Sequence, residues 1–272
     1  MINPARGFNP SGQEMAPVAV LGGLFTGSEA LPFYMGTLAG HATANLPYED
    51  RFIPPPNRGL GDKDEMFAEL EEKLLSVYDR LEQPFVLAGH SLGGLLASKF
   101  ALKHPEATAA VVCFAGAQEG VLEETFCVLA LRFGIEKITR RKSQYDHILF
   151  GSDHMLEHRQ AVSDGWSDDV GVHLISPAHD VLFPLPHGLR MPLPKTNPAN
   201  TYVVGRSTED IMHIEGMPEQ TIGIPSLLKP DHILLPWHPS ALAKLREVRV
   251  EAALASGNAP LGNVAVELAM AA

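Results

Sequence analysis

The chain has 272 residues, of which 45 % are apolar and 19 % are charged, and its formal net charge is −11. This composition excludes a disordered chain, which would be poorer in apolar residues and richer in charge. The negative balance argues against a nucleic-acid-binding protein, because phosphate recognition needs clustered Lys and Arg. The length fits about one or two domains, and since α/β domains often run to this size as single units, we expect one globular domain over residues 1–272.

The sequence carries no sign of a membrane or secretory segment. No stretch approaches the roughly 20 apolar residues of a membrane helix. The first residues, MINPARGFNPSGQEM, lack the apolar core of a secretory signal. The two cysteines, Cys113 and Cys127, form no CxxC pair of the kind found in zinc and redox sites. We expect a cytoplasmic protein with two reduced, buried thiols.

Short apolar runs alternate with amphipathic segments along the chain. Strands are predicted at 17–21, 85–88, 109–115 and 172–176, and helices at 30–38, 62–81, 95–104 and 240–254. This alternation predicts a mostly parallel sheet flanked by helices. Residues 118–168 interrupt the rhythm and are interpreted as a helical cap insertion. The proline-rich segment 53–57 cannot form a central strand or a helix.

The most informative segment is Gly89-His90-Ser91-Leu92-Gly93, called here the serine turn. Its pattern, G-x-S-x-G, is short and also fits an ordinary glycine turn. Its position between an apolar strand and a helix favours a nucleophilic serine, because a strained turn there makes the hydroxyl protrude. A side chain at either flanking glycine would clash with the neighbouring strand or helix. The following helix directs backbone N–H groups toward developing negative charge.

Residues 84–106 (PFVLAGHSLGGLLASKFALKHPE) resemble the nucleophile strand, turn and helix of α/β-hydrolases of the esterase and lipase type. Residues 18–27 (VAVLGGLFTG) are similar to the first-turn segment of that family, with Gly22 where a histidine is usual. The resemblance implies an α/β-hydrolase fold. It also implies that Ser91 is the nucleophile and that the N–H groups of Leu24 and Leu92 form the oxyanion hole.

In this fold the acid and the base follow the serine in the chain. The resemblance places the acid at Asp180, just beyond the strand predicted at 172–176, with Glu119 as a rival. It places the base at His232, because 231–242 (DHILLPWHPSAL) is similar to the loop that precedes the last helix. His213 is the rival base, since it would shorten the interval from the acid.

A second motif, His154-Met155-Leu156-Glu157-His158, matches the H-x-x-E-H pattern of some zinc enzymes. On a helix its two histidines share a face and could bind one zinc ion, with Asp153 or His147 as further ligands. Such a short pattern in a histidine-rich chain fits a solvated polar helix face better. We expect no metal and no other cofactor.

The resemblance implies a serine hydrolase that cleaves carboxylic esters, a carboxylesterase or lipase, through an acyl-enzyme on Ser91. The expected partner is a small-molecule ester with an apolar acyl or alcohol part. Thioester hydrolysis, acyl transfer to an alcohol and perhydrolysis use the same triad and stay open. Two further alternatives are a non-catalytic binding protein of the same fold and a zinc hydrolase that uses His154 and His158.

Overall fold

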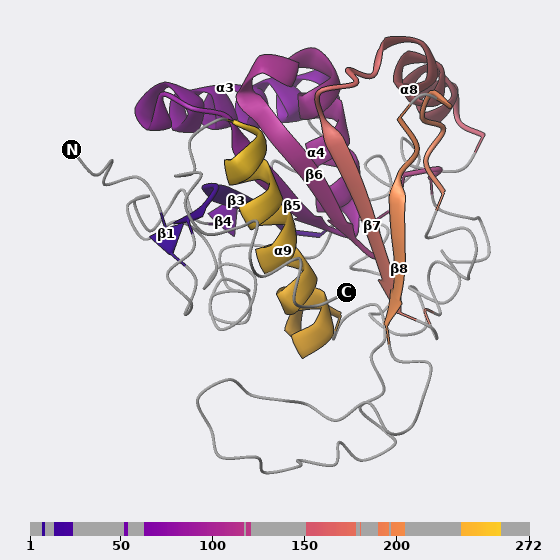
Figure 1. Cartoon of the computed structure of the whole chain (residues 1–272). Coiled ribbons are helices and arrows are strands. Elements are labelled where there is room, and N and C mark those ends of the chain that lie inside the picture. The colour runs from indigo at the N-terminus through magenta and orange to yellow at the C-terminus, as the bar shows by residue number, and fades with distance from the viewer. Residues whose placement is uncertain are drawn as a thin grey trace, which may run out of the picture.

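The computed structural model describes residues 7–8, 14–23, 52–53, 63–116, 118–120, 151–177, 180, 190–195, 197–204 and 235–256. The main sheet of this described part has six strands: β3 (Val18–Leu21), β4 (Phe52–Ile53), β5 (Phe85–His90), β6 (Thr108–Phe114), β7 (Gly171–Pro177) and β8 (Asn200–Val204). They lie in the order β4-β3-β5-β6-β7-β8, and every pairing is parallel (Figure 1). The short strands β1 (Gly7–Phe8) and β2 (Glu14–Met15) form a separate antiparallel pair.

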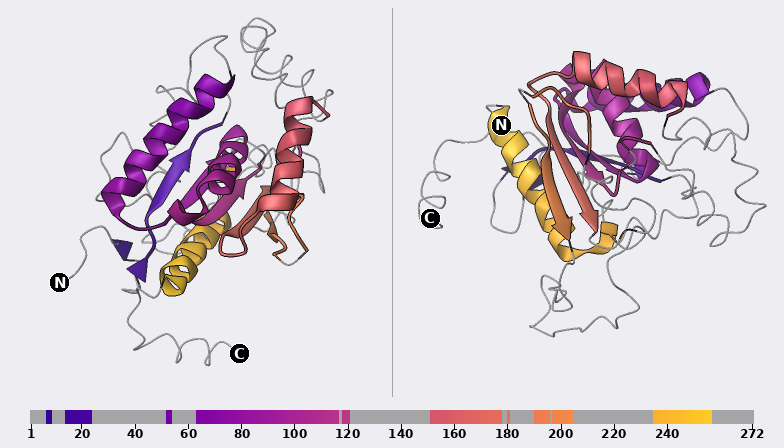
Figure 2. Two further views of the ribbon diagram at one scale, coloured as in Figure 1. Left: turned by 90° about the horizontal axis from the view of Figure 1, so that it is seen from above. Right: turned by 90° about the vertical axis from the view of Figure 1, so that its right-hand side faces the viewer.

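Helices cover both faces of this sheet. The helices α3 (Lys63–Leu81), α4 (Leu92–Lys103) and α8 (Asp153–Gly165) lie on one face, and α9 (Pro239–Ala255) lies on the other (Figure 2). Two short 3-10 helices, η3 (Pro105–Ala107) and η6 (Leu235–Trp237), precede β6 and α9. No helix in the described stretches is long and apolar enough to cross a membrane. The predicted parallel sheet with flanking helices is confirmed.

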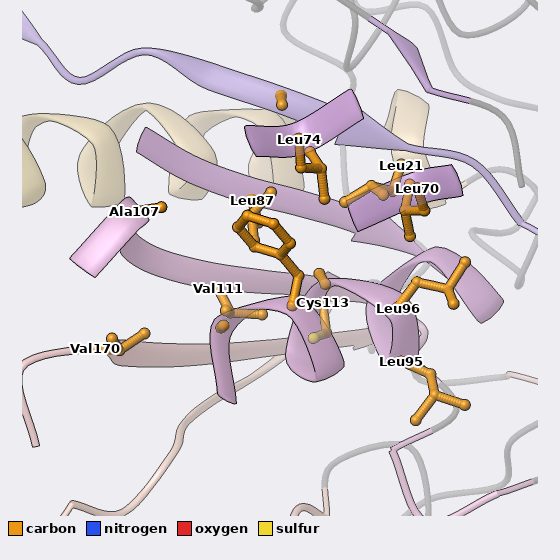
Figure 3. Packing of buried hydrophobic residues seen from close by; sticks show 14 of the residues in the cluster. Leu21, Leu70, Leu74, Leu87, Leu95, Leu96, Ala107, Val111, Cys113 and Val170 are labelled. Carbon is orange, nitrogen blue, oxygen red and sulfur yellow. The ribbon is translucent and has the colours of Figure 1, made fainter. Parts of the chain in front are cut away.

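Alternate residues of each strand face opposite helix layers. In β5, Phe85 and Leu87 pack in the core with α3, α4 and α8, whereas Val86 and Ala88 pack in the core with α9. Since both faces are covered, the strand is apolar throughout rather than alternating with polar residues. Figure 3 shows the first layer, where strand residues meet helix residues: Leu21, Leu87 and Val111 with Leu70, Leu74 and Leu96.

Most predicted boundaries agree with the structure. The helices expected at 62–81 and 240–254 are α3 and α9, and the strands expected at 109–115 and 172–176 are β6 and β7. The helix expected at 95–104 begins earlier, at Leu92, because the chain enters α4 directly from the serine turn. Two edge strands escaped prediction: β8, and β4, which includes the first residue of the proline-rich segment. The helix predicted at 30–38 lies outside the described residues.

The predicted cap at 118–168 is described only at its two ends. Its later end contains α8, which Ser152 caps by accepting a hydrogen bond from the Met155 N–H at 3.3 Å. Met155 and Val162 are fully buried in the same core as α3 and α4. This helix therefore belongs to the layer that covers the sheet. Residues 121–150 lie outside the described part, so a cap there stays a prediction.

The helix α9 is hydrogen-bonded to the chain just before β3. Arg249 of α9 is only 2 % exposed. Its Nε donates a hydrogen bond of 2.8 Å to the Ala16 carbonyl, and the Ala16 N–H donates one of 2.9 Å to the Arg249 carbonyl. Burial lowers the pKa of the Arg249 guanidinium to about 10. These bonds fix the chain just before β3, the strand that ends beside the serine turn.

A buried histidine on the α9 face makes stability depend on pH. His173 of β7 stacks on Tyr202 of β8 with ring centroids 6.2 Å apart, and Lys244 of α9 lies over the Tyr202 ring at 4.4 Å from its centroid. Burial, with a smaller contribution from the Lys244 charge, lowers the pKa of His173 from 6.5 to about 4. Its Nδ1 has no hydrogen-bond partner within the described structure.

We predict that the substitution His173→Phe reduces the loss of stability on acidification. The unfolded chain binds a proton on this histidine near pH 6.5 and the folded protein only near pH 4. Falling pH therefore favours unfolding across this window, by up to about 1.4 kcal/mol per pH unit. Urea unfolding at pH 7 and pH 4.5 measures the difference between variant and wild type.

The control for this prediction is Tyr202→Phe, which keeps the ring stack and leaves His173 in place. This control should retain the pH dependence of the wild type, whereas His173→Phe should lose part of it. An identical pH dependence in all three proteins would show that His173 titrates alike in the folded and unfolded states.

Candidate active site

Ser91 occupies a strained turn between β5 and α4. β5 ends at His90 and α4 begins at Leu92, so Ser91 alone connects them, at φ 55° and ψ −120°. Positive φ is uncommon for a residue with a side chain and costs on the order of 1–3 kcal/mol. The Ser91 N–H donates to the Phe114 carbonyl at 2.9 Å, and the Gly94 N–H donates to the Ser91 carbonyl at 3.0 Å. This is the turn that the G-x-S-x-G pattern predicts.

The two flanking glycines stand where no side chain fits. A Cβ on Gly89 would lie 2.3 Å from the Gly93 carbonyl oxygen. A Cβ on Gly93 would lie 2.3 Å from the Leu21 carbonyl oxygen and 2.7 Å from that of Gly22. Real Cβ contacts are much longer, so the predicted clash is confirmed at both positions. The contact at Gly93 is with β3, the strand next to β5.

Ser91 lies where the sheet changes direction. The chain leaves β3 toward β4 on one side, and it leaves β5 through α4 toward β6 on the other side. Ligands of open α/β sheets bind in the crevice outside the carboxyl ends of the strands at such a point. The end of β3 reaches the serine here, because a Cβ on Gly23 would lie 3.2 Å from Ser91 Cβ and 3.5 Å from His90 Nδ1.

The structure describes one of the two residues predicted to form the oxyanion hole. Leu92 is the first residue of α4 and is buried. Its N–H belongs to the first turn of the helix. N–H groups there have no partner inside the helix, and the positive end of the helix dipole lies there. Leu24 lies outside the described residues. A Cβ on its chain neighbour Gly23 would lie 3.2 Å from Ser91 Cβ.

The predicted acid Asp180 is buried and comes three residues after the end of β7. Since β7 pairs with β6 and β6 pairs with β5, Asp180 follows a strand end at the same edge of the sheet as Ser91. The rival acid, Glu119, forms an ion pair with Arg159 of α8 at 3.8 Å. Its carboxylate is therefore engaged with the helix layer. The predicted base His232 and its rival His213 both lie outside the described residues.

The H-x-x-E-H motif lies on α8. The Nε2 of His154 is hydrogen-bonded to the Lys99 ammonium, so this ring nitrogen already has a partner. Burial lowers the pKa of His158 to about 3, and the neighbouring Lys99 and His154 contribute. The described residues contain no group of three or more His, Cys, Asp or Glu side chains placed to hold a metal. His147 lies outside them.

A buried polar cluster behind the serine turn was not predicted. Gln118, on the turn after β6, is 2 % exposed. Its amide contacts the Ser98 hydroxyl of α4 and the Cys113 thiol of β6. Cys113 was expected to be a buried thiol, and its burial is confirmed; burial raises its pKa to about 12. No pattern in the sequence around Gln118 indicates that its side chain is buried and bonded to Ser98 and Cys113.

No protein-family model matches the sequence, and no curated protein matches it significantly. Among solved structures, a candidate aryl esterase from Burkholderia cenocepacia matches with a TM-score of 0.51 at 12 % identity, over 91 % of this chain and 98 % of that one. An esterase from Thermogutta terrifontis matches at 0.47 and 16 % identity, over 90 % and 97 %. MGS-MChE2, an α/β-hydrolase from a sediment metagenome of the Mar Chica lagoon in Morocco, matches at 0.48 and 16 % identity, over 86 % and 89 %.

Identities this low bear on the fold alone, because one fold serves many activities. The parallel strand order, the position of Ser91 in a strained strand-to-helix turn and the first of these matches agree with one another. The chain has the α/β-hydrolase fold, as its sequence predicts.

Proposed function

We propose that the chain is a serine hydrolase that cleaves carboxylic esters through an acyl-enzyme on Ser91. The observation that carries this proposal is the geometry of the serine turn: Ser91 is held at φ 55° at the direction change of the sheet. A strained serine there has a cost, and strain of this kind persists where the surrounding packing supports a functional geometry. The first turn of α4 and the end of β3 flank the same residue.

The proposed chemistry is acyl transfer to water. Ser91 Oγ attacks the ester carbonyl carbon while His232 takes the hydroxyl proton. The bond to the leaving alcohol oxygen breaks, and His232 gives that proton to the alcohol. A water molecule then attacks the acyl-enzyme with His232 as base again. The carboxylic acid leaves and the Ser91 hydroxyl is restored.

The other proposed residues stabilise charge that develops during these steps. Asp180 orients the His232 imidazole and stabilises its cationic form. The N–H groups of Leu24 and Leu92 hold the oxyanion of the tetrahedral intermediate. One such donor typically contributes roughly 100- to 1000-fold to the rate. The proposed substrate is a small-molecule ester with an apolar part.

We predict that Ser91→Ala abolishes hydrolysis of p-nitrophenyl esters from acetate to palmitate, because the acyl-enzyme cannot form. The chain-length optimum of the wild type then separates an esterase from a lipase. A fluorophosphonate probe should label the wild type and leave the variant unlabelled. Equal turnover in both proteins would remove Ser91 as the nucleophile. Labelling without ester turnover would favour thioester hydrolysis or acyl transfer on the same serine.

We predict that His232→Ala loses most of the turnover, roughly 10³-fold or more in kcat, since Ser91 then has no base. The matched control is His213→Ala, which should stay within a few-fold of the wild type. Steady-state kinetics with the best p-nitrophenyl ester measures both. The reverse outcome would assign the base to His213.

We predict that Asp180→Asn lowers kcat strongly, on the order of 10³- to 10⁴-fold, because the amide orients the wrong tautomer of the base. The control is Glu119→Gln, which changes a carboxylate already paired with Arg159 and should leave kcat within a few-fold of the wild type. The same assay compares the two variants. A large loss in Glu119→Gln with none in Asp180→Asn would move the acid to the turn after β6.

A further inference from the structure

The Gln118 side chain lies between α4 and the end of β6. A Cβ on Gly94 of α4 would lie 3.3 Å from the Gln118 Nε2, and a Cβ on Gly116 would lie 3.2 Å from the same atom. A side chain at either glycine would therefore press on the amide. The amide is nearly sealed from solvent, so each of its polar atoms needs a partner inside the protein.

Both ends of the Gln118 amide have such partners. The Ser98 hydroxyl donates to Gln118 Oε1 at 2.8 Å and shares its proton with the Gly94 carbonyl at 3.0 Å. The Gln118 Nε2 donates to the Cys113 Sγ at 2.9 Å. One side chain thus connects the first two turns of α4 to the last residues of β6.

These bonds lie directly behind the serine turn. The Gly94 N–H donates to the Ser91 carbonyl, and the Ser91 N–H donates to the Phe114 carbonyl of β6. Ser91 is thereby held between the two elements that Gln118 joins, through Gly94 on one side and the residue after Cys113 on the other. A shift of α4 relative to β6 would move both Ser91 and the neighbouring Leu92 N–H.

The turn that presents Gln118 is itself firmly held. The chain leaves β6 through Ala115 at φ 48°, a strained value for alanine, and the Ala115 N–H donates to the Ile175 carbonyl of β7 at 2.7 Å. Strain of this kind persists only where the surroundings over-determine it. The strands β6 and β7 and the helix α4 all contribute to fixing the glutamine.

We propose that Gln118 is a positioning residue for the serine turn, which holds Ser91 Oγ and the Leu92 N–H at their reacting geometry by tying α4 to β6. This inference rests on the proposed function of Ser91. Gln118 itself does not touch the substrate. Its effect falls on the chemical step, because a small displacement of a nucleophile or an oxyanion donor costs a large factor in rate.

The test begins with Gln118→Leu, which keeps much of the volume and removes both polar ends of the amide. We expect kcat to fall roughly 10- to 100-fold with KM within about two-fold of the wild type. Ser98→Ala removes the partner at the other end and should lower kcat as well. The double variant should lose no more than Gln118→Leu alone, because both changes break one network.

The matched control is Val77→Ala, a fully buried change on α3 in the same core layer. It destabilises the protein without touching the network, so its kcat should stay within two-fold of the wild type at a temperature where it is folded. Circular dichroism fixes that temperature for each variant. A kcat of Gln118→Leu as high as that of the control would overturn the proposal.

A conservative variant provides a second test that a purely structural role would not pass. The neutral carboxyl of Gln118→Glu can accept from Ser98 and donate to Cys113, as the amide does. Its ionised form can only accept, and would draw the Cys113 S–H away from the Gly94 carbonyl. The Cys113 thiol stays protonated throughout, since its pKa is about 12. The ratio of kcat in Gln118→Glu to kcat in the wild type should therefore rise as pH falls. A flat ratio below one would contradict the proposal.

Failure of this inference is separable from failure of the proposed function. Without wild-type labelling by the fluorophosphonate and without ester turnover, the proposed function fails, and the positioning role fails with it. With wild-type labelling, the same labelling rate in Gln118→Leu overturns the positioning role alone. Hydrogen exchange of peptides covering 91–98 gives a third readout, which should speed up in Gln118→Leu and stay unchanged in Val77→Ala.

Discussion

The backbone of α4 at Gly93 lies against the carbonyl end of β3, with no room for a side chain between them. The rest of the site follows from this contact. Because α4 must start this close to β3, the chain has a single residue in which to turn from β5 into the helix. Ser91 is that residue, and its φ of 55° is the result. The same contact brings the end of β3, and Gly23 with it, to the serine.

Packing of α4 offsets the strain in this turn. Nine of its 12 residues are buried, among them Leu95, Leu96 and Phe100. Full burial of one such side chain contributes about 1.5–3 kcal/mol, whereas one residue at positive φ costs on the order of 1–3 kcal/mol. A single buried leucine is thus comparable with the strain, and three large side chains exceed it. The helix is apolar over most of its surface because the sheet and its neighbouring helices cover it, and the Lys103 side chain in its last turn is exposed.

The sequence predicted the features that depend on local pattern. Unbroken apolar runs marked β5 and β6, and the G-x-S-x-G pattern marked Ser91, because its glycines reflect contacts within a few residues. It missed β8, a short edge strand whose first residues are exposed. It also set the start of α4 three residues late, since Gly93 and Gly94 are weak helix formers that only burial holds in a helix. The hydrogen bonds of Gln118 could not be predicted from local pattern, because its partner Ser98 lies 20 positions away in the sequence.

Gln118 differs from other buried polar groups of the described structure in the hydrogen bonds that it makes. His158 and His173 each leave one ring nitrogen without a partner in the described structure, and their lowered pKa values keep them neutral near pH 7, so they behave as packing groups. Gln118 has a partner at each end of its amide, in two elements. An apolar residue in its place would give up about 0.5–1.5 kcal/mol of net stability per hydrogen bond, so stability accounts for only part of the role of the amide. An apolar residue would lack directional contacts. Hydrogen bonds fix the position of α4 relative to β6, whereas apolar contacts allow the two elements to shift.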